Sequence, residues 1–206
     1  MIRSKSPFGD HTQKYWDRRY DLFAKWDEGV ETDAVGLFSV KPERFALEIG
    51  KLLEGDVILD AFCGIGGSAI GFARCGKRVI ALDIDRDRLS MARRNAEIYG
   101  VSERIAFIHD DVTQAYPRLA FDAVHIDPPW GGPDYAKKER FGWEDFSPNP
   151  LPLVRRAISA GVAVAVGLPA NFSKDALGEL PAETVLRESR DATRVLFKTA
   201  YYPPVA

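Results

Sequence analysis

The chain has 206 residues, of which 46% are hydrophobic and 28% are charged, and its formal net charge at pH 7 is -2. This length and apolar content fit one α/β domain with a small appendage and leave too little chain for two full domains. The nearly balanced charge excludes a surface that coats nucleic acid over a broad area, so any nucleic-acid contact must come from a local basic patch.

The cysteines and the apolar segments point to an ordinary intracellular protein. Cys63 and Cys75 form no CxxC pair and accompany no histidine cluster, so neither a metal site nor a disulfide framework is expected. The first residues lack the apolar segment of a signal peptide, and no stretch reaches the roughly 20 apolar residues of a membrane helix. We expect a cytoplasmic protein, or a nuclear one in a eukaryote, with no membrane partner.

Residues 1–54 predict a helical extension that packs on the remaining domain, residues 55–206. Residues 12–28 carry aromatic and aliphatic side chains at helical spacing, which predicts one amphipathic helix. A second helix is expected from Pro42 to about Leu53, because proline suits the first helical position and Glu43 favours the positive end of the helix dipole.

From residue 57 onward, short apolar strands alternate with helices. The expected strands are 57–59, 78–82, 105–108, 122–126 and 162–166, and the expected helices are 68–74, 86–99 and 151–160. This alternation predicts a parallel sheet covered by helices on both faces. Two further strand-like segments, 183–190 and 193–202, predict a C-terminal antiparallel hairpin. The expected fold is thus α/β, with a seven-stranded, mostly parallel sheet.

A glycine-rich turn follows the first strand and reads Asp60-Ala61-Phe62-Cys63-Gly64-Ile65-Gly66-Gly67-Ser68. Glycines let the backbone approach a ligand closely, and the free N–H groups of the following helix point into the same space. The string from Gly64 also fits a dinucleotide fingerprint, with Asp83 about 20 residues on. However, Asp60 can attract an ammonium group, whereas it would repel a pyrophosphate. The pattern looks like motif I of class I, Rossmann-like methyltransferases, whose cofactor is S-adenosylmethionine.

Acidic residues follow the next two strands. Asp83 ends the second strand, and we expect it to accept hydrogen bonds from both ribose hydroxyls of the cofactor. Ile84 beside it and Phe62 of the glycine-rich turn are further expected cofactor contacts. After the third strand, Asp111 is favoured as the partner of the adenine amino group, and Asp110 is left open.

The tetrapeptide Asp127-Pro128-Pro129-Trp130 follows the fourth strand at the same edge of the sheet. The prolines fix the backbone, and the Trp130 ring offers a face for a flat base. The Asp127 carboxylate and a proline carbonyl can accept hydrogen bonds from an exocyclic amino group and so orient its lone pair towards an activated methyl. Positioning and charge placement then suffice for catalysis. We predict Asp127, Pro128 and Trp130 as catalytic residues, with Asp127 also near the cofactor.

The residues after this motif are candidate substrate contacts. Tyr135 can stack, hydrogen-bond or pack. Lys137 forms a basic cluster with Lys138 and Arg140 and is a candidate phosphate contact.

These motifs resemble those of the trimethylguanosine synthase family, which methylates N2 of the guanine in RNA caps. The matching strings are Tyr15-Trp16, Arg19-Tyr20, Leu22-Phe23, Phe38-Ser39-Val40, Pro42-Glu43, Asp60-Ala61-Phe62-Cys63-Gly64, Gly66-Gly67, Asp83-Ile84-Asp85, Ala92-Arg93, Asn95-Ala96-Glu97 and Pro128-Pro129-Trp130-Gly131-Gly132-Pro133-Asp134-Tyr135. The resemblance covers roughly residues 14–135, and its last string is very specific.

The resemblance implies roles that spacing alone does not. The segment Phe38-Ser39-Val40-Lys41 would close over S-adenosylmethionine, with Phe38, Ser39 and Val40 as the expected contacts. Trp130 would stack on guanine, and a cationic 7-methylated ring would add a cation–π energy of roughly 0.5–2 kcal/mol. Basic residues of the N-terminal region would hold the phosphates; the candidates are Lys14, Arg18 and Arg19. The implied activity is methylation of guanine N2 in capped or other RNA. We favour a monomer as the oligomeric state.

Other functions stay open at this point. Asp127 stands where eukaryotic members of the family carry serine, so the chain resembles a compact or prokaryotic-type member. An acid at this position is similar to the ribosomal-RNA guanine-N2 methyltransferases and to the adenine-N6 and cytosine-N4 methyltransferases of RNA or DNA. A catalytically inactive RNA- or cap-binding module would require a broken cofactor site, whereas Asp60, Gly64, Gly66 and Asp83 are all present. An NAD-dependent oxidoreductase is a weaker alternative, because this chain has no suitably placed Tyr-x-x-x-Lys pair or catalytic histidine.

Overall fold

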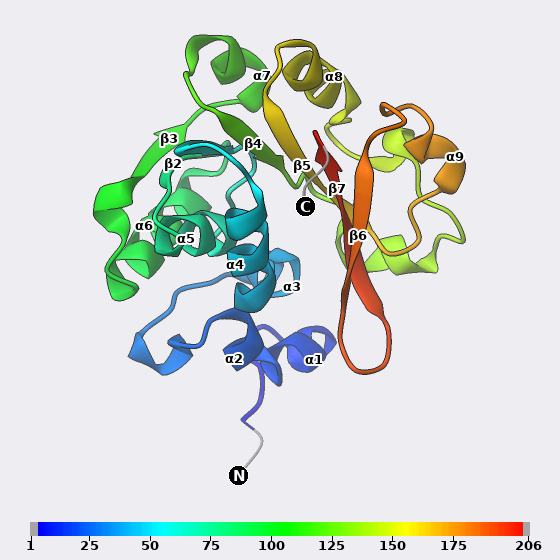
Figure 1. The fold of residues 1–206 in the computed structure, drawn as a ribbon. Coiled ribbons are helices and arrows are strands. Elements are labelled where there is room, and N and C mark those ends of the chain that lie inside the picture. The colour runs from blue at the N-terminus through cyan, green and yellow to red at the C-terminus, as the bar shows by residue number, and fades with distance from the viewer. Residues whose placement is uncertain (1–3, 204–206) are drawn as a thin grey trace.

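The computed structural model describes residues 4–203, except for the side chains of Pro133, Asp134 and Ala136. Its centre is one seven-stranded sheet with the order β3-β2-β1-β4-β5-β7-β6 (Figure 1). The strands are β1 (Val57–Asp60), β2 (Arg78–Asp83), β3 (Ile105–His109), β4 (Ala123–Ile126), β5 (Ala163–Pro169), β6 (Val185–Arg190) and β7 (Val195–Tyr202). The first five are parallel, and β7 runs antiparallel to β5 and β6. The predicted sheet is confirmed.

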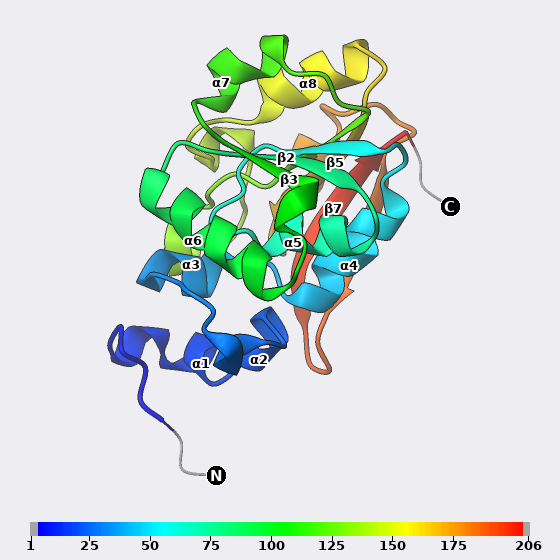
Figure 2. The same cartoon turned by 90° about the vertical axis from the view of Figure 1, so that its left-hand side faces the viewer.

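Helices cover both faces of the sheet, as Figure 2 shows. On one face lie α4 (Glu43–Leu52), α5 (Gly67–Arg74) and α6 (Arg86–Ile98), and on the other lie α7 (Val112–Ala115) and α8 (Leu151–Ser159). The four longer helices α4, α5, α6 and α8 agree with their predicted ranges to within one residue at each end. The remaining helices are short: α1 (Gln13–Trp16), α2 (Arg19–Leu22), α3 (Ala34–Ser39) and α9 (Lys174–Leu177).

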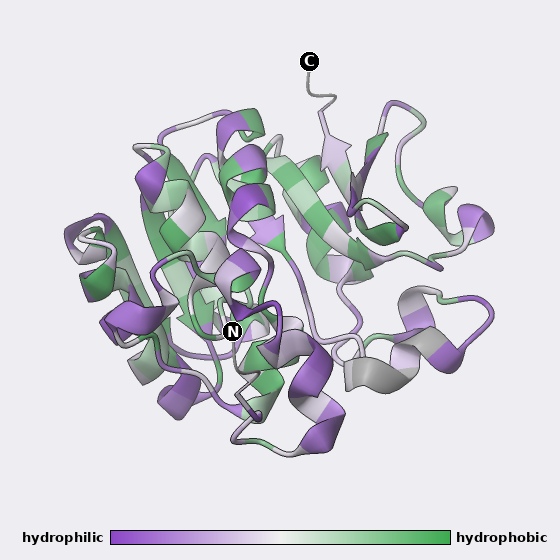
Figure 3. Cartoon of the chain, turned by 90° about the horizontal axis from the view of Figure 1, so that it is seen from below, coloured by the Kyte–Doolittle hydropathy of each residue, from purple (hydrophilic) through white to green (hydrophobic). Residues whose placement is uncertain are grey.

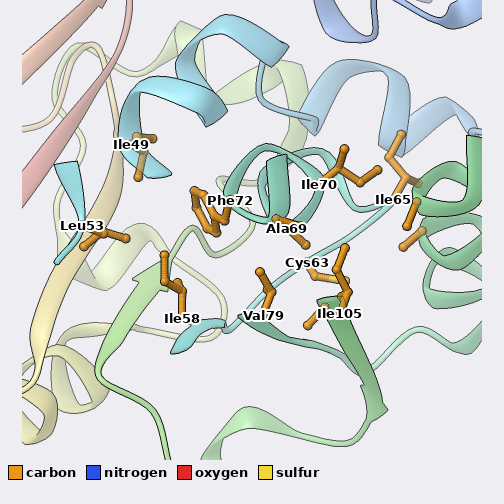
Figure 4. Packing of buried hydrophobic residues seen from close by; sticks show 14 of the residues in the cluster. Ile49, Leu53, Ile58, Cys63, Ile65, Ala69, Ile70, Phe72, Val79 and Ile105 are labelled. Carbon is orange, nitrogen blue, oxygen red and sulfur yellow. The ribbon is translucent and has the colours of Figure 1, made fainter. Parts of the chain in front are cut away.

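The sheet separates two hydrophobic layers, because successive strand residues point to opposite faces. Figure 4 shows Phe72 of α5 close to Ile58 and Val79 in the layer under α4 and α5. The strand residues Leu59 and Val124 belong instead to the layer under α7 and α8. Figure 3 shows the same segregation as green strands inside and purple residues on the outer helices. In residues 4–203 no helix has the length and apolar content needed to cross a membrane.

The prediction of one continuous helix over residues 12–28 is wrong. The segment divides into α1, α2 and short 3₁₀ turns, and the backbone at Phe23 is extended, with φ -140° and ψ 116°. The N–H group of Ala24 then donates to Glu43 Oε2 on α4 at 2.9 Å. The N–H group of Lys25 likewise donates to the Tyr99 hydroxyl at 3.2 Å. The chain can leave the helix here because the side chains of Glu43 and Tyr99 satisfy these two backbone donors.

The N-terminal extension and the main domain share a single core. Leu22, Phe23 and Leu37 are buried in the same cluster as Ile58 of β1. The predicted boundary after residue 54 therefore does not separate two hydrophobic cores. Side chains from residues 1–54 and from residues 55–206 pack in the same cluster.

Glu43 connects the extension to the core, since its carboxylate accepts hydrogen bonds from the Ala24 N–H, the Tyr99 hydroxyl and Arg74. Burial acts to raise the pKa of Glu43, but the hydrogen bonds from Tyr99, Ala24 and Arg74 outweigh it and hold the pKa below its ordinary value. A carboxylate whose pKa is lower in the folded than in the unfolded state stabilises the fold. This stabilisation is complete at pH values above the unfolded-state pKa and is lost as the pH falls through the folded-state pKa.

We therefore expect Glu43→Gln to lower the free energy of unfolding by about 1–2 kcal/mol at neutral pH, because the charge-assisted hydrogen bonds are weakened. The difference from the wild type should shrink as the pH is lowered, and urea denaturation at several pH values measures both effects. Glu54→Gln, at an exposed position just past α4, is the control and should change stability by less than about 0.5 kcal/mol. Equal effects of the two substitutions would contradict the role of Glu43.

Candidate active site

The glycine-rich turn joins β1 to α5 at the carboxyl edge of the parallel strands. Gly64 and Gly66 have φ values of 52° and 91°, and Gly66 caps α5. A Cβ at Gly66 would lie 3.0 Å from Cβ of Ala92 on α6, whereas nothing lies within 4 Å of a Cβ built at Gly64. The turn is thus packed against α6 at Gly66 and open at Gly64, which leaves its backbone accessible to a ligand.

The buried side chain of Asn95 holds this turn to the N-terminal extension. Its amide nitrogen donates to the carbonyls of Ile65 and Glu31, at 3.0 and 2.9 Å, and its amide oxygen accepts from the Glu31 N–H at 2.8 Å. The sequence assigned no role to Asn95. Its polarity on the apolar stripe of a predicted helix, and its place in the matching string Asn95-Ala96-Glu97, were the available signals.

Asp60 ends β1 with a fully buried side chain. Its Oδ1 lies 2.9 Å from Nδ1 of His125 on the neighbouring strand β4, and its Oδ2 has no hydrogen-bond partner within the described residues. A buried carboxylate oxygen without a donor is unfavourable, so this atom fits a ligand ammonium or a bridging water. His125 was not predicted as part of the site, and its polarity inside a buried strand was the available signal.

Asp83 ends β2 and is bound by the turn itself. Its Oδ2 accepts the Gly64 N–H at 2.7 Å and its Oδ1 accepts the Asp85 N–H at 2.9 Å. Burial raises the pKa of Asp83, against the lowering effect of these two N–H groups. Each oxygen keeps a further lone pair, so two ribose hydroxyls can still donate to it. The neighbouring Ile84 side chain is 69% exposed and offers an apolar surface at the same edge.

The two aspartates after β3 differ in what remains available to a ligand. Asp110 is engaged through both oxygens, by the Asp111 N–H and by Arg118. Asp111 caps α7 through Oδ1 alone, with Thr113 as donor. This favours Asp111 for the adenine contact. Phe62 is half-buried against the layer under α7 and α8.

The segment Phe38–Lys41 lies between the glycine-rich turn and the loop after β4. A Cβ at Gly67 would lie 2.3 Å from Cγ2 of Val40, so Val40 sits directly over the turn. Phe38 carbons lie 3.7 Å from the Cβ position of Gly132, beyond the Asp127–Trp130 motif. Ser39 between them is exposed. The segment therefore lies beside both the glycine-rich turn and the loop after β4.

Asp127 follows β4 at the same edge of the sheet. Its Oδ2 forms an ion pair with Nζ of Lys41 at 2.9 Å, and the two side chains are only 16% and 3% exposed. Its Oδ1 is buried and has no partner within the described residues. A Cβ at Gly167 on β5 would lie 2.0 Å from this Oδ1, so the carboxylate occupies the space that a side chain would fill. From the sequence, Lys41 was expected only as part of the segment that closes over the cofactor, and neither its pairing with Asp127 nor a role for Gly167 was predicted.

Trp130 and Tyr135 form an aromatic wall beyond Asp127. Their ring centroids lie 5.3 Å apart at an interplanar angle of 84°. Burial raises the pKa of the Tyr135 hydroxyl, Tyr15 acts in the same direction, and Arg194 of the β6–β7 loop opposes both. Tyr15 also packs on Phe38, with ring centroids 6.0 Å apart, so the N-terminal extension lies beside the loop that carries the wall.

The basic residues predicted to hold phosphates mostly have intramolecular contacts. Arg18 pairs with Asp191 of the β6–β7 loop at 3.3 Å, and the Arg19 guanidinium lies over the Trp16 ring, 4.8 Å from its centroid. Lys14 and Lys137 are exposed. Arg18 and Arg19 would have to exchange these contacts for phosphate, so the phosphate role of all four stays a prediction. In the described part of the chain, no group of three or more His, Cys, Asp or Glu residues is placed to hold a metal ion.

Comparison with known proteins agrees with this arrangement. A family model described as RNA cap guanine-N2 methyltransferase matches residues 55–200. Trimethylguanosine synthase of Schizosaccharomyces pombe is 38% identical over 197 residues, which cover 90% of this chain and 81% of that protein.

Solved structures share the fold. A putative methyltransferase from Porphyromonas gingivalis W83 aligns with a TM-score of 0.70 at 13% identity, over 94% of this chain and 50% of that one. An RNA methyltransferase from Salinibacter ruber, solved with S-adenosyl-L-homocysteine, aligns with a TM-score of 0.51 at 21% identity, over 78% of this chain and 88% of that one. At these identities the likeness concerns the fold alone, and it confirms the expected methyltransferase architecture.

The glycine-rich turn yields a matched test of cofactor binding. Gly66 and Gly76 flank α5 with φ values of 91° and 89°, so alanine at either position strains the backbone by about 1–2 kcal/mol. We expect only Gly66→Ala to weaken S-adenosylmethionine binding, by about tenfold or more, because it alone alters the turn. Isothermal titration below the unfolding temperature measures this. If Gly66→Ala and Gly76→Ala weaken S-adenosylmethionine binding equally, the loss comes from lower stability of the fold and not from a changed cofactor site.

Proposed function

The chain belongs to the RNA cap guanine-N2 methyltransferase family, and from this premise we propose that its acceptor is the N2 amino group of the guanine in a 7-methylguanosine cap. The chain is an S-adenosylmethionine-dependent enzyme that methylates guanine N2 in RNA. The proposal concerns which guanine is methylated and which residues act. The name of the Schizosaccharomyces pombe relative, trimethylguanosine synthase, supports a cap.

The proposal rests on a buried carboxylate oxygen that has no partner among the described residues and that lies in the same loop as an aromatic wall. Asp127 presents a buried Oδ1 without a partner, and Trp130 and Tyr135 follow in the same loop. A purine stacked on Trp130 would bring its exocyclic amino group to Asp127. A cationic 7-methylguanine gains roughly 0.5–2 kcal/mol more from such a ring than a neutral guanine does.

The residues of the carboxyl edge fit the cofactor. When bound, S-adenosylmethionine supplies a methyl group on a sulfonium that is already activated for displacement. Asp83 would accept hydrogen bonds from the ribose, Ile84 and Asp111 would contact the adenine, and the unpartnered Oδ2 of Asp60 would receive the ammonium directly or through water. Val40, over the glycine-rich turn, would cover the bound molecule.

The acceptor residues act by orientation. Oδ1 of Asp127 and the Pro128 carbonyl would accept hydrogen bonds from the guanine amino group and turn its lone pair towards the methyl. As nitrogen forms its new bond, positive charge develops on it beside the Asp127 carboxylate, which stabilises that charge. The alkylated amine then loses a proton without a strong base.

A guanine of RNA outside a cap is the second candidate. The pairing of Arg18 with Asp191 favours it, because a guanidinium already held by a carboxylate offers less to a triphosphate bridge. The family match speaks against the adenine-N6, cytosine-N4, NAD-dependent and non-catalytic alternatives.

Methylation of a substrate panel tests the proposal. The panel holds a 7-methylguanosine cap analogue, an unmethylated cap analogue, total RNA and DNA, and the modified nucleoside is identified by mass. We expect N2-methylated guanine, with the 7-methylguanosine analogue as the best acceptor. A clear preference for uncapped RNA would replace the cap with the second candidate.

Trp130→Ala is expected to reduce methylation of the cap analogue by about 100-fold or more, since the stacking surface that orients the base is lost. The affinity for S-adenosylmethionine should stay within about twofold of the wild type. Phe121→Ala removes a half-buried ring that precedes β4, at the opposite edge of the sheet, and serves as the control for truncating a large ring. Full activity of Trp130→Ala would refute the stacking role.

A further inference from the structure

The Lys41–Asp127 ion pair joins a buried ammonium to a half-buried carboxylate inside the acceptor site. The Lys41 side chain is 3% exposed, and its Nζ lies 2.9 Å from Asp127 Oδ2 and 3.9 Å from the ring centroid of Phe197 on β7. Neither the binding of the base nor the methyl transfer described above requires a cation at this place. Buried charges are unfavourable unless they are paired, so the pair calls for an explanation beyond packing.

Asp127 is restrained on both sides of its carboxylate. The parallel register of β4 and β5 pairs Ile126 with Val166, so the next residues along, Asp127 and Gly167, lie opposite each other. A Cβ at Gly167 would come within 2.6 Å of the Asp127 Cγ atom, which shows how closely the backbone of β5 approaches the carboxylate. With Lys41 at Oδ2 and Gly167 beside Oδ1, the carboxylate is held in one orientation.

We propose that Lys41 is a positioning residue for methyl transfer: by holding Oδ2 of Asp127, it leaves Oδ1 as the atom that accepts the hydrogen bond from the acceptor amino group. This inference rests on the proposed function, because it assumes that Asp127 receives that amino group. Lys41 follows Val40, which lies over the glycine-rich turn, so the same short segment touches the cofactor side and orients the acceptor side.

The chemistry of lysine makes the inference testable with an asparagine at position 127. An ammonium only donates hydrogen bonds, so Lys41 would bind the amide oxygen of Asp127→Asn and turn the amide NH₂ towards the substrate. A donor would then face the donor amino group of the base. Without Lys41, the amide can rotate and present its oxygen instead. The double variant should therefore be more active than Asp127→Asn alone.

The experiment measures methyl transfer to the 7-methylguanosine cap analogue for Lys41→Met, Asp127→Asn and the double variant. Turnover is expressed per S-adenosylmethionine-binding site, counted by titration, so that loss of folded protein does not count as loss of activity. We expect each single substitution to lower kcat by about 100-fold, as the loss of one preorganised contact does, and the double variant to regain about tenfold over Asp127→Asn. Lys51→Met on the exposed side of α4 is the control and should leave kcat unchanged.

Two results would overturn the inference: a Lys41→Met enzyme with wild-type kcat and KM, or a double variant no more active than Asp127→Asn. The wild-type enzyme separates this inference from the proposed function. If the wild type fails to methylate any guanine of the panel, the function is wrong. If it methylates guanine but the double variant regains nothing, only the role of Lys41 is wrong.

Discussion

Parallel pairing of β1 with β2 and with β4 is the constraint on which the rest of the site depends. Parallel strands end at the same edge of a sheet, so the residues that close β1 and β2 and the one that follows β4 meet there although they are far apart in the chain. Asp60, Asp83 and Asp127 are these residues. One sheet edge thereby carries three carboxylates, and the glycine-rich turn lies among them.

Three carboxylates at one partly buried edge would repel one another without partners, and the fold supplies a different partner to each. Asp60 has His125, Asp83 has two backbone N–H groups, and Asp127 has Lys41. In Asp60 and Asp127 one oxygen is paired and the other is left without a donor. Each of these two carboxylates therefore keeps one oxygen that a further hydrogen-bond donor could satisfy.

The N-terminal extension is part of this arrangement and not a separate appendage. Its residues enter the core beneath β1, and its final segment carries Val40 and Lys41 to the glycine-rich turn and to Asp127. Glu43, two residues later, holds the preceding stretch through the Ala24 N–H. Loosening of the extension would therefore disturb the cofactor side and the acceptor side together.

The sequence by itself determined the strands, the four longer helices, the glycine-rich turn and the acidic residues that follow the strands. These features are local, since periodicity, caps and turn residues act over a few neighbouring positions. The tertiary structure alone decided that residues 12–28 break into short helices, that His125 pairs with Asp60, and that Lys41 and Gly167 enclose Asp127. Each of these depends on contacts between residues distant in the chain, which sheet register and helix packing set and which no local pattern encodes. The Asp127-Pro128-Pro129-Trp130 motif was visible in the sequence, whereas the packing around it decided that Oδ2 of Asp127 pairs with Lys41 and that Oδ1 has no partner within the described residues.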